Sequence, residues 1–211
     1  MSVSDLRQDY DKFNLQESDL AATPFDQFDL WFSQALQGDV PEPNAMTLAT
    51  VDERGQPSAR IVLIKDYDAR GFVFYTNYQS RKGHELAHNT RASLSFFWQP
   101  LQRQVLIEGT TEQVSREESQ TYFHSRPLGS RIGAWASQQS HPIGDRSELE
   151  RRVQQFEAQY GDHPPCPDHW GGYRLLPERV EFWQGRPSRL HDRIVYHTNG
   201  QGGWTTQRLA P

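Results

Sequence analysis

The chain has little cysteine and no long apolar run. Cys166 is the only cysteine among 211 residues, so no disulfide can form within one chain, and we expect a reducing compartment, the cytoplasm. No apolar stretch approaches the ~18 residues that a membrane-spanning helix needs. The opening residues, Met1–Asp5, lack the basic and apolar parts of a secretory leader. These absences predict a soluble protein with no membrane partner.

An excess of positive charge is also missing. The 22 Lys and Arg residues face 27 Asp and Glu residues, which gives a formal net charge of −5. This balance argues against nucleic acid as a partner, and any anion site must be local. The sequence has no Gly-x-Gly-x-x-Gly, no Walker A loop and no Gly-x-Ser-x-Gly elbow. Neither of the usual nucleotide cradles is therefore present, nor is the serine-hydrolase nucleophile.

One loop has the spacing of a metal site. His163, Cys166 and His169 form a His-x-x-Cys-x-x-His pattern between prolines. The prolines stiffen this loop and no fourth ligand is evident, so we expect no metal.

The hydrophobic periodicity predicts an α+β fold. Residues 1–22 are polar and lack a clear period, which is typical of a flexible segment or a flap that orders on binding. Residues 23–211 are then one domain. Strands are predicted at 46–51, 58–65, 72–76, 91–98, 104–112, 173–176, 180–183, 194–197 and 204–208. They follow one another without the strand–helix alternation of a parallel sheet, which indicates a barrel-like antiparallel sheet.

Helices are predicted around this sheet. Thr23 and Pro24 begin the first, which ends at Gly38. Further helical patterns cover 80–89, 115–125 and 145–160, with a turn-rich or helical piece over 127–140. Ser115 and Glu118 have the spacing of a capping box.

Two cations open the predicted helix at 80–89. Arg81 and Lys82 lie in its first turn, which the helix dipole already makes positive. They indicate an anion bound among them and on free backbone N–H groups. The alternative is solvated surface charge.

A second set of donors recurs every four residues. Tyr122, Arg126 and Ser130 could line one face, and together suit a phosphate monoester. Arg60 and Lys65 bound an apolar strand, and strand parity points them to opposite faces. They can serve one site only if a bulge or the strand end re-aims one of them. A lysine that merely reaches solvent from a strand end is the alternative.

A polar cluster follows the Gly/Pro turn after Trp183. Arg189, His191, Asp192 and Arg193 stand between two strand patterns, where a loop can fix functional groups. A charged hairpin tip in water is the alternative. Several anion sites beside aromatic residues imply ligands with two phosphates and aromatic rings. Flavin mononucleotide (FMN) beside a phosphorylated aromatic substrate suits this description.

These motifs, taken in order, resemble the pyridoxamine 5′-phosphate oxidase family, also called the pyridoxine 5′-phosphate oxidase family. The resemblance covers nearly the whole chain, from Arg7 to Pro211. It is carried by residues 60–65, 74–77, 80–82, 103–105, 122–127, 132–135, 182–185 and 189–193.

The resemblance implies a split β-barrel homodimer that binds FMN between its subunits. The implied flavin contacts are Arg60, Ile61, Val62, Leu63, Ile64, Lys65, Tyr75, Thr76, Arg81, Lys82, Gln104, Gln139, Ser140, Trp183 and Arg193. The implied substrate contacts are Arg7, Tyr10, Lys65, Tyr122, Arg126, Ser130, Arg189, Leu190 and His191. Arg7 and Tyr10 would close over the substrate as a flap.

The implied reaction is oxidation of pyridoxamine or pyridoxine 5′-phosphate at C4′ to pyridoxal 5′-phosphate. A hydride goes to the flavin, and O2 reoxidises the flavin to give H2O2. Arg189 and His191 are the candidate catalytic residues, and which of them is a base, if either, stays open. A split-barrel flavin binder or reductase that does not act on B6 vitamers is the alternative, and it would not need the substrate set.

Overall fold

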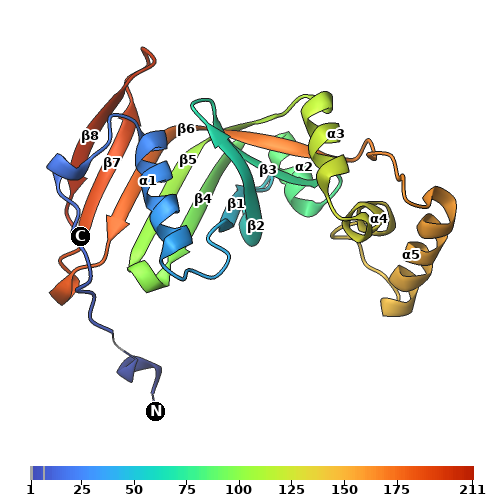
Figure 1. Ribbon diagram of the computed structural model, residues 1–211, viewed down its shortest axis with the longest axis horizontal. Coiled ribbons are helices and arrows are strands. Elements are labelled where there is room, and N and C mark those ends of the chain that lie inside the picture. The colour runs from blue at the N-terminus through green and yellow to red at the C-terminus, as the bar shows by residue number, and fades with distance from the viewer. Residues whose placement is uncertain (1, 7) are drawn as a thin grey trace.

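The architecture is an antiparallel barrel extended at one end by helices (Figure 1). The structure is a computed structural model, and it describes residues 2–6 and 8–211. Within these residues one sheet has the strand order β3-β2-β1-β4-β5-β6-β7-β8, and a further pairing of β3 with β6 closes it. Its strands are β1 (Ala45–Val51), β2 (Pro57–Asp68), β3 (Gly71–Asn77), β4 (Arg91–Trp98), β5 (Arg103–Gln113), β6 (Trp170–Gln184), β7 (Asp192–Thr198) and β8 (Trp204–Leu209). The predicted antiparallel split barrel is confirmed.

Helix α1 (Pro24–Gln37) covers the barrel, as its start and stop signals predict. The Thr23 hydroxyl accepts the N–H of Asp26 at 3.2 Å, which satisfies a free donor of the first turn. Phe28 is fully buried and meets Phe72 and Phe96 edge to face, with ring centroids 5.0 and 5.1 Å apart. The apolar face of this helix therefore closes the core of the barrel.

The other helices gather at the end of the molecule opposite β7 and β8 (Figure 1). They are α2 (Arg81–His88), α3 (Arg116–Ser125), α4 (Leu128–Ala136) and α5 (Arg146–Tyr160). Single 3-10 turns occur at Val3–Asp5, Glu17–Asp19, Gln99–Leu101 and Pro187–Arg189. Helix α5 packs on α4 through the rings of Trp135 and Tyr160, whose centroids are 5.0 Å apart. No helix in the described ranges is long and apolar enough to cross a membrane.

Two local predictions are wrong. Residues 173–176 and 180–183 are parts of one strand, β6, which runs through Pro177. A register shift opposite Glu108 and Gly109 leaves Glu178 unpaired, and this bulge accommodates the proline. The predicted capping box is only half formed, because Ser115 caps α3 while the Glu118 carboxylate accepts a bond from Arg174 at 3.1 Å.

Much of the N-terminal segment lies against the barrel. Leu15 is only 2% exposed, and its N–H donates to the Asp192 carboxylate at 3.1 Å. The N–H groups of Asp11 and Lys12 both donate to the side-chain carbonyl of Gln102. Tyr10 packs on Gly185 so closely that a Cβ atom there would lie 2.6 Å from the Tyr10 ring. These contacts bring the segment to the loop that carries His191.

Candidate active site

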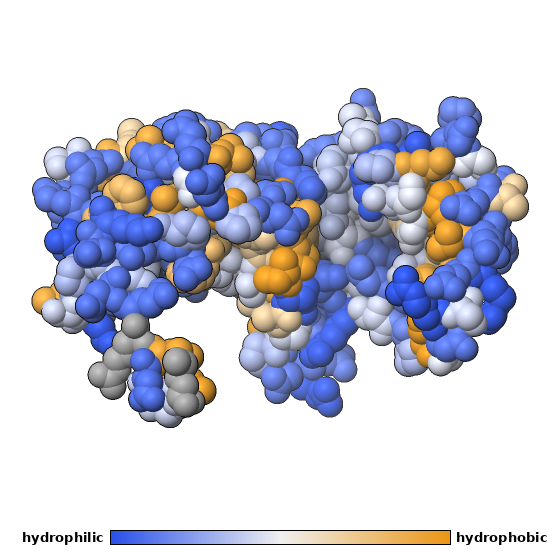
Figure 2. Space-filling model, turned by 60° about the horizontal axis from the view of Figure 1, so that its bottom comes forward, coloured by the Kyte–Doolittle hydropathy of each residue, from blue (hydrophilic) through white to orange (hydrophobic). Residues whose placement is uncertain are grey.

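A cavity of about 450 Å³ opens between the barrel and the helices at its end. Figure 2 shows the surface hollowed between the barrel and these helices. Its walls come from β2, β3, the first turn of α2, and the α3–α4 segment. The lining residues are Ile61, Val62, Leu63, Lys65, Tyr75, Thr76, Asn77, Lys82, Tyr122, Arg126, Ser130, Gly133, Ala134, Ser137, Gln139 and Trp170. The cavity thus collects the whole predicted phosphate set, Lys65, Tyr122, Arg126 and Ser130.

Arg126 packs on an aromatic stack, and one of its guanidinium nitrogens has no acceptor among the described residues. Its guanidinium carbon lies 4.6 Å from the centroid of Trp170, which itself stacks 5.4 Å from Tyr75. Tyr75 stacks on Tyr122 at 4.0 Å. Among the described residues, the buried Nη1 of Arg126 has no hydrogen-bond acceptor. Burial lowers the pKa of Arg126, because it takes the charged guanidinium out of water. An anionic ligand would supply both a compensating negative charge and the missing hydrogen-bond acceptor.

The side chains of Arg60 and Lys65, both within β2, have different surroundings, as parity predicts. Lys65 lines the cavity with Ile61, Val62 and Leu63, of which Ile61 and Leu63 have its parity. A register shift between Ile64 and Asp66 marks a bulge at Lys65. Arg60 does not line this cavity, and instead lies in a polar cluster next to it.

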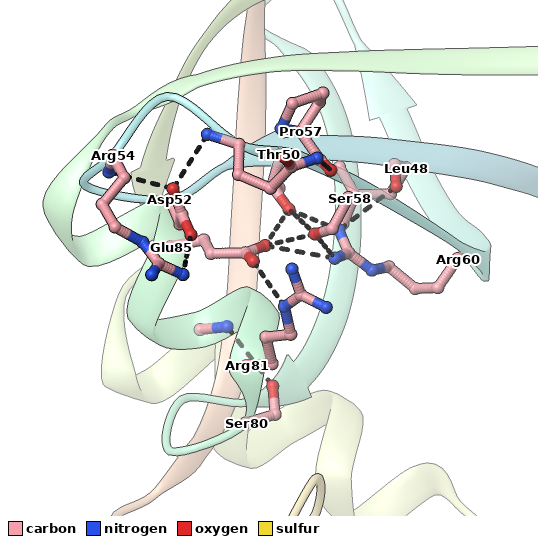
Figure 3. Close-up of polar contacts among 12 residues, drawn as sticks. Leu48, Thr50, Asp52, Arg54, Pro57, Ser58, Arg60, Ser80, Arg81 and Glu85 are labelled. Atoms are coloured by element: carbon pink, nitrogen blue, oxygen red, sulfur yellow. Dashed lines mark hydrogen bonds and ion pairs between the residues drawn. The ribbon is translucent and has the colours of Figure 1, made fainter.

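Glu85 organises that cluster (Figure 3). Its side chain is 4% exposed and forms ion pairs with Arg60 at 3.1 Å and with Arg81 at 2.8 Å. Thr50 and Ser58 also donate to it, at 2.5 and 2.7 Å. Burial by itself raises the pKa of Glu85, but these hydrogen bonds outweigh it and lower the pKa to about 2. The carboxylate is therefore ionised and ties α2 to β1 and β2.

At the start of α2 the two predicted cations diverge. Arg81 is 59% exposed and turns toward Glu85, whereas Lys82 is buried and lines the cavity. The Lys82 ammonium donates to Oε1 of Gln139 at 2.8 Å, and the Thr76 hydroxyl donates to the same oxygen at 3.4 Å. Burial lowers the pKa of Lys82, and nearby Arg60 adds to this effect. Two donors converging on one oxygen mark a position that suits an anionic oxygen.

The remaining predicted contacts lie at the other end of the sheet. Gln104, Trp183 and Arg193 are cross-strand neighbours on β5, β6 and β7, so they form one row. Arg193 is held by the buried Glu181 at 2.7 Å and by the Ala210 carbonyl at 3.1 Å. Arg193 lowers the pKa of Glu181 against the effect of burial, so this pair stays charged.

The loop before β7 forms a second cavity of about 530 Å³. Tyr10, Arg189 and His191 line it with residues of the N-terminal segment. The His191 ring lies 4.6 Å from Trp183 and 6.0 Å from Tyr10, between centroids. The pKa of His191 is lowered by burial and by Arg189. The candidate catalytic residues are thus brought together, but apart from the first cavity.

Three predicted contacts, Ile64, Leu190 and Ser140, have other surroundings. The Ile64 side chain is in the core, 4% exposed, so only its backbone can reach a ligand. Leu190 is 69% exposed, and Ser140 is exposed with a φ of 72°. Arg7 lies outside the described residues.

Sequence reasoning missed several residues of the site. Asn77, Ser137 and Trp170 line the first cavity, and Glu85 holds two of the predicted flavin contacts. Asn77 directly follows the Tyr75-Thr76 pair, which was a usable signal. Glu85 resembles an ordinary surface residue of a short helix, and its role depends on partners distant in sequence.

The two cavities lie toward opposite ends of one outer face of the sheet. Ile61 pairs with Thr47 and then Ser95 across the sheet, while Phe97 shares the row of Gln104 and Trp183. Phe97 and Ser95 share a face because they are two residues apart. Ile61 and Phe97 are 66% and 53% exposed. Exposed apolar residues on this face are typical of a contact surface.

Comparisons with known proteins bear on the family and on the C-terminal part of the chain. Residues 32–160 match the family model described as pyridoxamine 5′-phosphate oxidase. Residues 170–211 match a pyridoxine 5′-phosphate oxidase C-terminal dimerisation region, which supports a homodimer.

Named relatives span the full chain. The protein named pyridoxine/pyridoxamine 5′-phosphate oxidase in Bordetella petrii is 69% identical to this chain, over 100% of both chains. The protein of that name in Paraburkholderia phymatum is 61% identical, over 100% of this chain and 99% of its own. Among solved structures, PhzG from Burkholderia lata in complex with tetrahydrophenazine-1-carboxylic acid has a TM-score of 0.90 and 31% identity, covering 96% of this chain and 100% of its own. An FMN-binding protein from Nostoc punctiforme shares the fold, with a TM-score of 0.71, 17% identity, and coverage of 91% and 100%.

Proposed function

The chain belongs to the pyridoxamine 5′-phosphate oxidase family, and on that basis we propose that it oxidises pyridoxine 5′-phosphate and pyridoxamine 5′-phosphate to pyridoxal 5′-phosphate. FMN is the proposed cofactor and O2 the proposed electron acceptor. The alcohol substrate and O2 give the aldehyde and H2O2. The amine substrate also consumes one water and releases ammonia.

The observation that carries this proposal is the unpaired guanidinium nitrogen of Arg126 in a cavity lined by phosphate donors. Lys65 adds a second cation, and the Tyr122 phenol and Ser130 hydroxyl add neutral donors. A dianionic phosphate monoester would satisfy Arg126 in a way that no described residue does. The Tyr122–Tyr75–Trp170 stack beside it offers flat apolar surface to an aromatic ring.

The donor set also fits FMN. Lys82, Thr76 and Gln139 would hold its phosphate end, with Arg81 turning in from the surface. Backbone groups of residues 61–64 would line the ring system. The chemistry that FMN supplies when bound is acceptance of a hydride from C4′ and delivery of two electrons to O2.

We further propose that each site is shared by two copies of the chain. Gln104, Trp183 and Arg193 form a row that lies away from the first cavity on the same outer face. A two-fold axis through this face would put the row of each copy beside the cavity of the other. The exposed side chains of Ile61 and Phe97 would be covered by the same contact. The dimerisation region matched over 170–211 supports this arrangement.

In this arrangement the second cavity would supply the catalytic groups. Arg189 and His191 would contact the pyridine ring and its C4′ substituent, and Tyr10 would cover them from the N-terminal segment. Their role is to bind and orient the substrate so that the C4′ hydrogen faces the flavin.

The proposal is tested by an absorbance spectrum and a peroxide assay. The purified protein should show a bound-flavin spectrum and should form H2O2 from pyridoxine 5′-phosphate. Pyridoxine without the phosphate is the matched control, and it should react far more slowly because it cannot use Lys65 and Arg126. A flavin-containing protein that forms no peroxide from either phosphorylated vitamer would favour the flavin-binder or reductase alternative. A protein that binds no FMN would contradict both readings.

A further inference from the structure

The His191 ring makes one hydrogen bond that decides where its proton is. Its Nδ1 lies 3.0 Å from the backbone nitrogen of Arg186. A backbone N–H can only donate, so Nδ1 must present its lone pair. In a neutral imidazole the single proton is then on Nε2.

We propose that His191 acts as a neutral hydrogen-bond donor through Nε2–H, held in that tautomer by the Arg186 main chain, and does not act as a base. The inference deepens the proposed function and rests on it. Nδ1 is occupied and Nε2 carries a proton, so neither nitrogen can accept a proton from the substrate. The ring is instead ready to donate to the oxygen or nitrogen on C4′.

The backbone of the loop is shaped to make this bond. Ser188 and Arg189 have φ values of 56° and 61°, which is uncommon for residues other than glycine. The N–H of Leu190 donates to the Pro187 carbonyl at 3.1 Å, which closes the turn. The turn reverses the chain between Arg186 and His191, so that the ring reaches back to the earlier N–H.

The residue after the ring is anchored independently. The Asp192 carboxylate accepts bonds from the Leu15 N–H at 3.1 Å and from the Arg208 guanidinium at 2.8 Å. These bonds tie the start of β7 to the N-terminal segment and to β8. On the other side the ring faces Trp183, with centroids 4.6 Å apart. The imidazole therefore lies between the Arg186 main chain and Trp183, on a loop that is anchored at Asp192.

Acid should destroy this arrangement. An imidazolium has N–H groups on both nitrogens, so Nδ1–H would face the Arg186 N–H. The charged groups around the ring are Arg186, Arg189 and Asp192 on its own loop and strand, and Asp9 on the N-terminal segment. Burial and Arg189 lower the pKa of His191, and Asp192 opposes them. The neutral form is therefore favoured at neutral pH, and activity should fall as the pH falls through this lowered pKa.

The Nε2–H tautomer of His191 determines where the substrate proton goes. When the C4′ hydride leaves the alcohol, the hydroxyl proton must leave too. With His191 as a donor that proton goes to water, and His191 has the same protons before and after the turnover. The hydrogen bond from Nε2–H positions the C4′ substituent during the transfer.

The tautomer can be read directly by nitrogen-15 NMR of the flavin-loaded protein labelled at histidine. His191→Asn removes one set of signals and so assigns them. We expect the two-nitrogen correlation pattern of an Nε2–H imidazole at neutral pH, with a midpoint of titration below the ordinary value of 6.5. An Nδ1–H pattern would overturn the inference without touching the proposed function.

Two substitutions test the role in catalysis. In His191→Gln the amide nitrogen can reach the position of Nε2 and donate, whereas in His191→Asn it reaches only that of Nδ1. His191→Gln should retain a kcat/KM roughly tenfold or more above that of His191→Asn. It should also lose the acidic decline of the wild-type pH profile. An equal loss in both variants would refute the donor role, and wild-type protein inactive toward B6 vitamers would refute the proposed function instead.

Discussion

Arg126 offers the sharpest test of the phosphate site, because its buried Nη1 has no hydrogen-bond acceptor among the described residues. Arg126→Met keeps an apolar side chain against Trp170 but removes the guanidinium that stacks on it at 4.6 Å. A hydrogen bond to a charged group contributes about 1.5–3 kcal/mol, or roughly ten- to a hundredfold in affinity. KM for pyridoxine 5′-phosphate should therefore rise by that factor, with kcat changed less.

The free energy of unfolding should change less than it does for most buried substitutions. Within the described residues the buried Nη1 atom has no acceptor, so removing it should not lower the free energy of unfolding. Urea unfolding of the ligand-free protein measures this directly. Arg131→Met is a matched control. Arg131 also has a buried nitrogen with no acceptor among the described residues, but it does not line the cavity. Its KM should stay at the wild-type value.

Unphosphorylated pyridoxine completes the comparison. Arg126→Met should leave the slow oxidation of pyridoxine unchanged, since pyridoxine has no phosphate that Arg126 could bind. An equal loss for both substrates, or loss of the flavin spectrum, would refute the assignment of Arg126 to the substrate phosphate.

Three further predictions concern the cofactor, the loop and the Glu85 cluster. Arg81→Ala should raise the Kd for FMN roughly ten- to a hundredfold in a flavin fluorescence titration, and an unchanged Kd would leave Arg81 as a surface partner of Glu85. Arg189→Ala and His191→Ala should stay yellow and dimeric while kcat/KM falls on the order of ten- to a thousandfold, whereas Arg193→Ala should lose flavin; colourless Arg189→Ala protein would contradict this division. The folded-state pKa of Glu85 is lowered from 4.5 to about 2, so its stabilisation is present above the unfolded value and is lost as pH falls from 4.5 toward 2. Glu85→Gln should unfold more easily at neutral pH, by on the order of 3 kcal/mol, with a flatter dependence across that window in urea titrations.

Local signals predicted most of the fold. The cap at Thr23, the stop at Gly38 and the period-two strands depend on neighbouring residues, and the structure confirms them. The division of β6 into two predicted strands falls at Pro177, a residue whose missing N–H usually ends a strand. The bulge that accommodates it needs Gly109 on the partner strand, where a Cβ atom would lie 2.0 Å from the Leu176 carbonyl oxygen. Such a cross-strand requirement is invisible within a single segment.

The candidate site could be predicted in part for the same reason. The spacing of Tyr122, Arg126 and Ser130 is local, and all three line one cavity. Strand parity predicted that Arg60 and Lys65 point to opposite faces, but it did not predict which of them faces the cavity. That choice depends on Glu85, which lies 25 residues from Arg60 in the chain and captures its guanidinium. The distance across the sheet between the first cavity and the row of Gln104, Trp183 and Arg193 likewise depends on the strand order, which no local signal predicts.

Subunit complementation can show whether one catalytic site is built from two chains. Lys82→Ala damages the first cavity, and Arg193→Ala damages the row at the other end of the sheet. Each variant alone should be colourless and inactive. Co-expressed, they should form mixed dimers in which one site has both substitutions and the other has neither, which restores about a quarter of the wild-type flavin and activity per chain. Mixed dimers that remain colourless and inactive would contradict the shared site.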